Sequence, residues 1–171
     1  AWAPINVIFV AKDISHVSDV IAAAGWSRAD SNGLPSLIHL FFSKVTGEKY
    51  NRAPVPAAFW NTDIQDMAFE FAGSNYRPDR HIRIWSTPFV FHDSRKVYVG
   101  TITNDVGRSW GLRHSLDPEI DVERDFFANE FNGVIKTIKI DKISPSSVLE
   151  VNKRNAGRIV TDGKLLFIDL F

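Results

Sequence analysis

The sequence contains no cysteine, so it can form no disulfide bond and no cysteine-based metal or redox site. Its 20 Lys and Arg residues balance its 20 Asp and Glu residues. A net charge of zero argues against a nucleic-acid partner, because nucleic-acid-binding domains are usually basic on one face. No apolar run reaches the roughly 18 residues that a transmembrane helix needs. We therefore expect a chain without a membrane-spanning segment of its own.

Length and composition predict one globular domain. The chain has 171 residues, of which 44 % are hydrophobic and 23 % are charged, as is usual for a protein with its own core. We expect a single α+β domain over residues 1–171, with a mostly antiparallel mixed sheet of about six or seven strands and about three helices. Apolar runs and alternating patterns indicate the strands. They cover residues 5–10, 57–60, 67–71, 81–90, 96–104, 134–143, 158–160 and 165–171.

Turn residues separate these strands. The polar run from His92 to Arg95 predicts a hairpin between strands 81–90 and 96–104. Asp162-Gly163 is a strong hairpin signal between the last two apolar runs. It predicts that the last two strands pair with each other.

Three segments have helical periodicity. The first can be capped by Asp13 or Ser15 and ends at Gly25. The second covers about residues 35–46. The third is predicted at about 118–132, and it contains several of the candidate site residues.

The stretch Trp110–Phe127 holds a histidine, five acids and two arginines. Asp117 is a strong N-cap for the predicted helix, and Pro118 is favoured at its first position. Acids recur one turn apart at 117, 121 and 125, and like charges at this spacing are mildly destabilising. Arg124 is the nearest cation that can offset them.

This stretch has three interpretations. It can be an ordinary acidic first turn, with Arg124 reaching solvent past the core. It can be an acid-lined pocket with His114 at its mouth. There His114 and Asp121 would hold a divalent cation, or His114, Asp121 and Asp125 would act as catalytic acid or base. The third interpretation is a buried ion network around Arg124.

A second candidate lies on the strand predicted at 81–90. His81, Arg83 and Trp85 alternate along it and therefore share one face. If that face points at the third helix, His81 could meet Asp121 or Asp125. A face with a His and an Arg suits phosphate or carboxylate, which Arg binds with two hydrogen bonds. The competing interpretation is a solvated strand face with Trp85 packed under a loop.

Gly107–Gly111 matches the G-x-S-x-G nucleophile motif, with Ser109 at its centre. That motif requires a strand, a tight turn and an immediate helix, whereas the next predicted helix begins at about Pro118. No His follows His114, although the usual order of such enzymes places the His last. We therefore interpret the match as accidental. The sequence also has no phosphate loop, no H-E-x-x-H and no EF-hand loop.

Short motifs occur in order along nearly the whole chain, at Gln65–Phe69, Arg80–Trp85, Val97–Gly100 with Asp105, His114–Asp125, Ala156-Gly157 and Thr161–Gly163. Together they resemble the LssY C-terminal domain family, bacterial domains associated with DedA-like or PAP2-type membrane phosphatase proteins. The family pattern has a His pair where this chain has Arg113-His114, so one ligand of any metal site there is missing.

The resemblance implies a bacterial, membrane-associated context and a membrane phosphatase or transporter-like partner. It assigns no chemistry, and the phosphatase motifs themselves are absent from this chain. The leading hypothesis is an accessory or sensory domain that binds a small anionic ligand or a lipid headgroup. The ligand-binding residues would be His81, Arg83, Arg113, His114, Asp117 and Arg124, with Asp121 and Asp125 orienting the cations.

Two alternatives remain, and whether the protein is an enzyme stays open. One is a metal-assisted, phosphoesterase-like hydrolase in which His114 and Asp121 bind the metal and Asp125 is a ligand or base. The other is a protein-interaction module with an aromatic surface that includes Trp2, Phe41 and Phe42.

Overall fold

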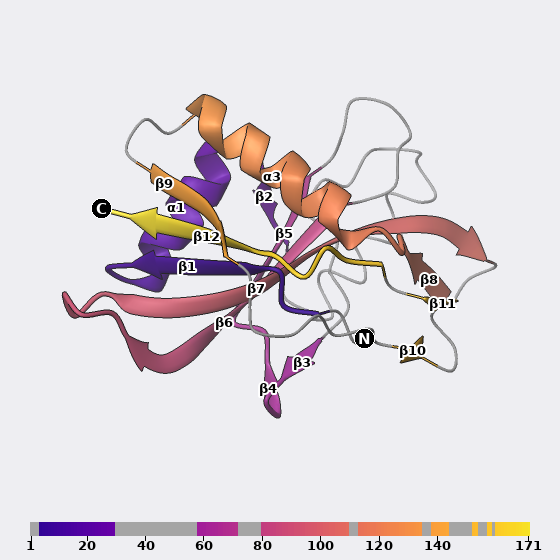
Figure 1. Cartoon of the computed structure of the whole chain (residues 1–171), viewed down its shortest axis with the longest axis horizontal. Coiled ribbons are helices and arrows are strands. Elements are labelled where there is room, and N and C mark those ends of the chain that lie inside the picture. The colour runs from indigo at the N-terminus through magenta and orange to yellow at the C-terminus, as the bar shows by residue number, and fades with distance from the viewer. Residues whose placement is uncertain are drawn as a thin grey trace.

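A mixed β-sheet with two helices on one of its faces forms the described part of the chain (Figure 1). The structure is a computed structural model. It describes residues 4–29, 58–71, 80–109, 113–134, 138–143, 152–153, 157–158 and 160–171.

The sheet has eight strands in the order β2-β5-β6-β7-β1-β12-β9, with β8 pairing alongside β7. β1 and β12 are parallel, and the other pairs of this sheet are antiparallel. The predicted α+β class with a mostly antiparallel mixed sheet is confirmed. The strands are β1 (Val7–Ala11), β2 (Ser27–Arg28), β5 (Met67–Phe71), β6 (Arg80–Val90), β7 (Lys96–Ser109), β8 (Arg113–Leu116), β9 (Ile138–Ile143) and β12 (Leu165–Leu170). Two further two-stranded sheets pair β3 (Phe59–Trp60) with β4 (Asp63–Ile64) and β10 (Asn152–Lys153) with β11 (Gly157–Arg158).

Two helices, α1 (Ile14–Ala23) and α3 (Ile120–Val134), lie within the described residues, fewer than the three predicted. The predicted helix at 35–46 lies outside the described residues. Asp13 caps α1 as expected, accepting a hydrogen bond from the His16 amide at 2.8 Å. Gly25 follows that helix with φ of 86°, a conformation that favours glycine.

α3 begins two residues later than predicted. The carboxylate of Asp117 accepts from the Glu119 amide at 2.9 Å, so it closes a short turn before the helix instead of capping its first turn. The side chain of Glu123 then fastens the helix to the sheet, because it accepts from Arg80 of β6 at 2.5 Å and from Asn104 of β7 at 3.0 Å.

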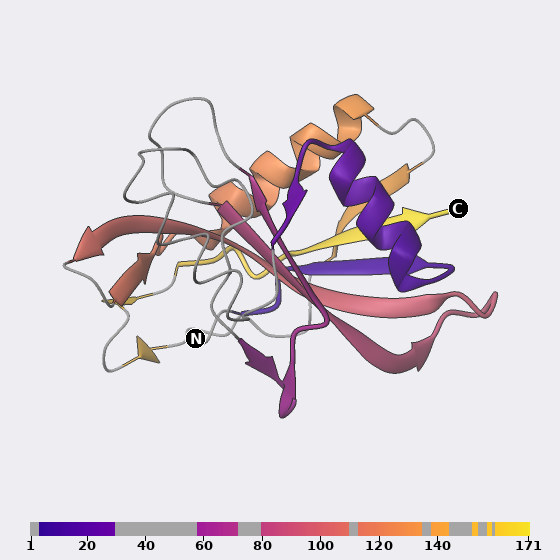
Figure 2. The same cartoon turned by 180° about the vertical axis from the view of Figure 1, so that it is seen from behind.

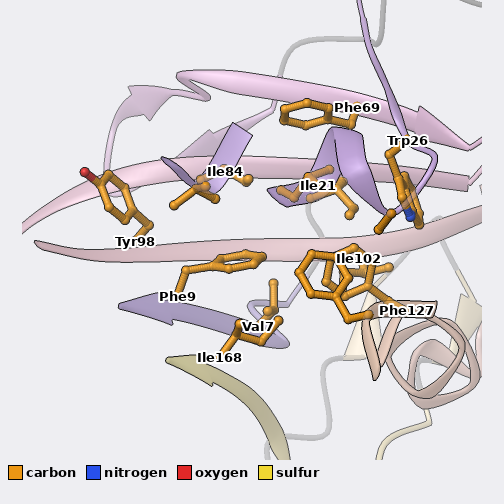
Figure 3. Packing of buried hydrophobic residues seen from close by; sticks show 14 of the residues in the cluster. Val7, Phe9, Ile21, Trp26, Phe69, Ile84, Tyr98, Ile102, Phe127 and Ile168 are labelled. Atoms are coloured by element: carbon orange, nitrogen blue, oxygen red, sulfur yellow. The ribbon is translucent and has the colours of Figure 1, made fainter. Parts of the chain in front are cut away.

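Both helices pack on the same face of the sheet. Figures 1 and 2 show α1 and α3 on one side of the strands, in views from opposite directions. Apolar residues of β1, β5, β6, β7 and β12 alternate toward them, as the period of two in a strand requires. Figure 3 shows part of this core, which includes Phe9, Ile21, Trp26, Ile102 and Phe127.

Gly100 allows the central strands to approach closely. A Cβ on Gly100 would lie 2.9 Å from the carbonyl oxygen of Arg83 and 2.9 Å from Cγ1 of Val7. One of these atoms belongs to the backbone of β6, so the clash can be relieved only if a strand moves. We expect Gly100→Ala to lower the free energy of unfolding by about 2 kcal/mol, measured by urea denaturation. An unchanged urea midpoint would contradict this prediction.

One predicted hairpin is confirmed and the other is wrong. β6 and β7 form the expected antiparallel pair, with Phe91 donating to the Arg95 carbonyl at 2.7 Å in the turn. The chain around Asp162-Gly163 does not form a hairpin, because β12 pairs with β1 and β9 instead. Val160 forms a bridge with Glu119, just before α3. The Asp162 side chain instead accepts hydrogen bonds from Arg124, as described below.

Candidate functional site

On β5, β6 and β7, the sheet face that points away from the helices carries five buried polar residues. On β5, β6 and β7 the apolar residues Phe69, Ile82, Ile84 and Ile102 face the helices and the core. Their sequence neighbours therefore point to the opposite face. We call this set the polar cluster: Glu70, His81, Arg83, Thr101 and Thr103.

Strand register places these residues side by side. Glu70 of β5 lies opposite His81 of β6, which lies opposite Thr103 of β7. In the next row of the same face, Arg83 lies opposite Thr101. Opposite residues in an antiparallel pair have Cβ atoms about 5 Å apart. The polar cluster is therefore one continuous patch across three strands.

The polar cluster is almost completely buried. Relative exposures are 8 % for Glu70, 4 % for His81, 3 % for Arg83 and 1 % for each threonine. Nδ1 of His81 lies 3.6 Å from Oε1 of Glu70, and Nη1 of Arg83 donates to the Thr103 hydroxyl at 3.4 Å. The Thr101 hydroxyl has no hydrogen-bond partner within the described residues. An unpaired buried polar group is costly, and it often marks a position for water or a ligand.

The expectation of a solvated strand face is thus wrong for His81 and Arg83. Trp85 is also buried, and its Nε1 donates to the Asp63 carbonyl at 3.0 Å. The β3–β4 hairpin that carries Asp63 lies on the side of the sheet away from α3 (Figure 1). His81 points away from α3, so the conditional expectation that it meets the acids of that helix is wrong.

The predicted site residues on α3 belong to a second, separate arrangement. Arg124 is 0 % exposed. Its guanidinium donates to Asp121 at 3.0 Å, to Asp125 at 2.9 Å and to Asp162 at 2.6 Å and 3.1 Å. It also donates to the Lys164 carbonyl at 2.7 Å. We call Arg124, Asp121, Asp125 and Asp162 the Arg124 network.

Asp121 completes this connection between α3 and the turn before β12. One of its oxygens accepts from the Thr161 hydroxyl at 3.0 Å, and the other accepts from the Asp162 amide. The third interpretation of the acidic stretch, a buried ion network, is therefore confirmed. The first interpretation, in which Arg124 reaches solvent past the core, is wrong. Arg124 offsets the acids of its own helix as expected, and it also binds an acid 38 residues away.

The electrostatics of the Arg124 network follow from these contacts. Burial alone would lower the pKa of Arg124, but hydrogen bonds to Asp162 and Asp125 and the charge of Asp121 raise it above its usual value. The hydrogen bond from Arg124 lowers the pKa of Asp162 to about 2, although burial acts in the opposite direction. Both groups are therefore charged at neutral pH. We assign Arg124 a structural role.

Arg113 and His114 lie elsewhere in the fold. Both belong to β8, where they pair with Ser109 and Arg108 of β7. Their side chains lie outside the described part of the structure. Arg108 is five residues beyond Thr103 on β7, and five strand residues span about 17 Å. The backbone of His114 is thus far from the polar cluster.

The metal hypothesis gains no support from the described side chains. Among them, no group of three or more His, Asp or Glu residues is arranged to hold a metal ion. Both oxygens of Asp121 already accept hydrogen bonds. Because the His114 side chain is not described, its role as a metal ligand or catalytic group stays a prediction.

The G-x-S-x-G match does not have the context of a nucleophile. Ser109 ends β7 and pairs with Arg113 at the start of β8, so a strand follows it instead of a helix. This arrangement agrees with the interpretation of the motif as accidental.

Sequence reasoning found His81 and Arg83 but missed the other members of the polar cluster. Glu70, Thr101 and Thr103 lie within strands that were predicted, and each directly follows an apolar residue or a glycine. Register between strands would have been needed to group them with His81. Asp162 was missed because its Asp-Gly pair was interpreted only as a turn.

Comparison with known protein families gives a match over most of the chain. A family model described as LssY C-terminus matches residues 2–165 of the chain. Neither the curated proteins nor the solved structures gave a match.

Proposed function

The chain belongs to the LssY C-terminus family, and from this premise we propose that it is an accessory or sensory domain of a bacterial, membrane-associated protein. The polar cluster binds a small anion that contains a phosphate group, either free or as part of a lipid headgroup. A membrane phosphatase or transporter-like protein or segment is the partner. No helix within the described ranges is long and apolar enough to cross a membrane.

The buried Thr101 hydroxyl beside Arg83 is the observation that carries this proposal. Arg83 supplies a planar cation that suits phosphate. Thr101 lies directly opposite it on β7, and the Thr103 hydroxyl lies 3.4 Å from its Nη1. His81 adds a further nitrogen donor to the same face. Burial strengthens hydrogen bonds to an anion, because the local dielectric constant is low.

The two buried arginines differ in their charge balance. Arg124 is bonded to three carboxylates, so its surroundings are net negative and repel a further anion. Among the described residues, the polar cluster contains one carboxylate, Glu70, together with the Arg83 guanidinium and the His81 imidazole. It is therefore the better candidate for binding an anion.

We expect Arg83→Gln to weaken the binding of inorganic phosphate by at least about tenfold, which corresponds to about 1.4 kcal/mol. Arg83→Lys keeps the positive charge but cannot form the two parallel hydrogen bonds of an arginine. Its affinity for phosphate should therefore lie between those of wild type and Arg83→Gln. Isothermal titration calorimetry of the whole chain measures both. The matched control is Arg28→Gln, because Arg28 is exposed on β2.

The folded state of each variant is checked by circular dichroism before titration. Phosphate binding that is equal in wild type, Arg83→Gln and Arg28→Gln would contradict the proposal. Sedimentation with vesicles that contain phosphatidic acid separates the two ligand sources. Binding to vesicles but not to inorganic phosphate would identify the ligand as a lipid headgroup.

A second candidate function is an interaction surface. Phe89, Val90 and Phe171 are 64 %, 67 % and 74 % exposed. Arg95 brings this end of the β6–β7 hairpin and the end of β12 together, since its guanidinium carbon lies 5.2 Å from the ring centre of Phe171. Exposed apolar groups of this kind favour contact with another protein. The aromatic residues that the sequence indicates for this role, Trp2, Phe41 and Phe42, lie outside the described residues.

A further inference from the structure

The turn before β12 contains a chemically labile pair of residues, Asp162-Gly163. In an Asp-Gly pair the glycine nitrogen can attack the carboxyl carbon of the aspartate, because glycine has no side chain to hinder the approach. The fold requires both residues here. Gly163 has φ of 73°, which favours glycine, and Asp162 accepts two hydrogen bonds from the guanidinium of Arg124. A substitution that removes the labile pair therefore disturbs either the turn or the Arg124 network.

Hydrogen bonds in the folded state engage both groups that take part in this reaction. The Asp162 carboxylate accepts from Arg124 at 2.6 Å and 3.1 Å and from the Lys164 amide at 2.8 Å. The Gly163 amide donates to the Thr161 hydroxyl at 3.0 Å. The attack requires the carboxyl group to turn toward the nitrogen and the nitrogen to lose its proton. These hydrogen bonds must break before either can happen.

The charge state of Asp162 opposes the reaction in the same direction. The hydrogen bond from Arg124 lowers the pKa of Asp162 to about 2, although burial acts in the opposite direction. A carboxylate anion is attacked more slowly than the neutral acid, which can release its hydroxyl group. Water does reach the turn, because the Asp162 side chain is 40 % exposed. The contacts with Arg124, and not the exclusion of water, are therefore what protects the pair.

We infer that Asp162-Gly163 is a site of spontaneous isomerisation to isoaspartate, and that the Arg124 network suppresses this modification. The nitrogen of Gly163 bonds to Cγ of Asp162, and the amide proton and the hydroxyl of the acid leave as one water molecule. The product is a cyclic succinimide. Water then opens the ring at one of its two carbonyl carbons. One opening restores aspartate, whereas the other routes the backbone through Cγ and leaves the mass unchanged.

Isoaspartate at this position changes the connection between α3 and β12. The backbone gains one carbon atom, and the free carboxylate is now attached to Cα instead of the Cβ arm that reaches Arg124. The hydrogen bonds between Arg124 and Asp162 are therefore lost in the product. The site lies outside the polar cluster, so it is independent of the proposed anion binding.

The experiment follows isoaspartate in the whole chain during long incubation at neutral pH. Peptide mapping by mass spectrometry with electron-transfer fragmentation locates it, and enzymatic methylation of isoaspartate measures its amount. We expect Arg124→Met to accelerate its formation at position 162 by at least about fivefold, the factor that corresponds to a lost coupling of about 1 kcal/mol. Thr161→Val removes the acceptor of the Gly163 amide but leaves Arg124 in place, so we expect a smaller acceleration.

Two control variants separate the network from other effects. Arg28→Met removes an exposed arginine and should isomerise at the wild-type rate. Phe127→Ala removes a core side chain that is 0 % exposed, so it destabilises the fold but leaves the Arg124 network intact. Equal acceleration by Phe127→Ala and Arg124→Met would overturn the inference, because general unfolding would then explain both. Equal rates for wild type and folded Arg124→Met would also overturn it.

Two further comparisons keep the inference testable if Arg124→Met does not fold. In that case Thr161→Val decides, and a rate equal to that of wild type would overturn the protective role of the network. Wild type in guanidinium chloride above its unfolding midpoint needs no variant. We expect isoaspartate to form at position 162 at least about tenfold faster there than in folded wild type, because the turn is then open all the time. Its absence in the unfolded chain would overturn the site itself.

Discussion

Phe127→Ala is expected to lower the free energy of unfolding by about 4 kcal/mol, the usual cost of removing a large aromatic side chain from a packed core. Phe127 is 0 % exposed. Its ring centre lies 4.2 Å from that of Phe131, 5.4 Å from that of Trp26 and 6.3 Å from that of Phe9. These residues come from α3, from β1 and from the segment after α1, so the substitution leaves a cavity where both helices meet the sheet (Figure 3).

Urea denaturation followed by circular dichroism measures this loss. Phe89→Ala is the matched control, because Phe89 is 64 % exposed and exposed substitutions usually change stability by less than about 0.5 kcal/mol. Similar urea midpoints for the two variants would contradict the central position of Phe127 in the core.

Local patterns in the sequence predicted the elements well. The alternation along β6 correctly placed His81, Arg83 and Trp85 on one face, because successive strand residues point in opposite directions. Alternation cannot show which face meets the helices. That depends on the partners of Ile82 and Ile84, which pack with residues of α1 and α3. The burial of His81 and Arg83 therefore could not be predicted from the strand alone.

The acidic stretch likewise contains one contact that the sequence predicted and one that it did not. The pairing of Arg124 with Asp121 follows from residues three positions apart on a helix, and the sequence made it the nearest candidate. The contact with Asp162 joins α3 to a turn that precedes a different strand. Nothing in the local pattern distinguishes an Asp-Gly pair that makes a hairpin from one that supplies a carboxylate to a distant helix.

Arg124→Met is expected to lower the free energy of unfolding by about 3 kcal/mol at neutral pH. Removing one partner of a buried ion pair usually costs about 3–5 kcal/mol. The low end applies here, because the three carboxylates are 21 %, 44 % and 40 % exposed and water can partly replace the arginine. Methionine fills much of the space, so the loss reports mainly on charge and hydrogen bonds.

Urea denaturation measures this effect, with Arg28→Met as the exposed control. A double-mutant cycle with Asp162→Asn isolates the long-range pair, because residues in one network lose stability non-additively. We expect the double variant to be more stable than the sum of the single losses predicts, by about 1 kcal/mol. Additive losses would show that Asp162 does not contribute to holding the turn on α3.

The pH dependence gives an independent test of the same pair. Arg124 lowers the pKa of Asp162 to about 2 from its usual value of 3.8. A carboxyl whose pKa is lower in the folded state stabilises the protein above its unfolded pKa, and this stabilisation disappears as the pH falls through the folded pKa. The contribution is therefore complete above about pH 4 and is lost toward pH 2. Because Asp162 is 40 % exposed, solvent screening limits it to about 1 kcal/mol. The difference in free energy of unfolding between wild type and Asp162→Asn should therefore shrink by about 1 kcal/mol between pH 5 and pH 2. If this difference does not change with pH, the charge of Asp162 does not contribute to stability.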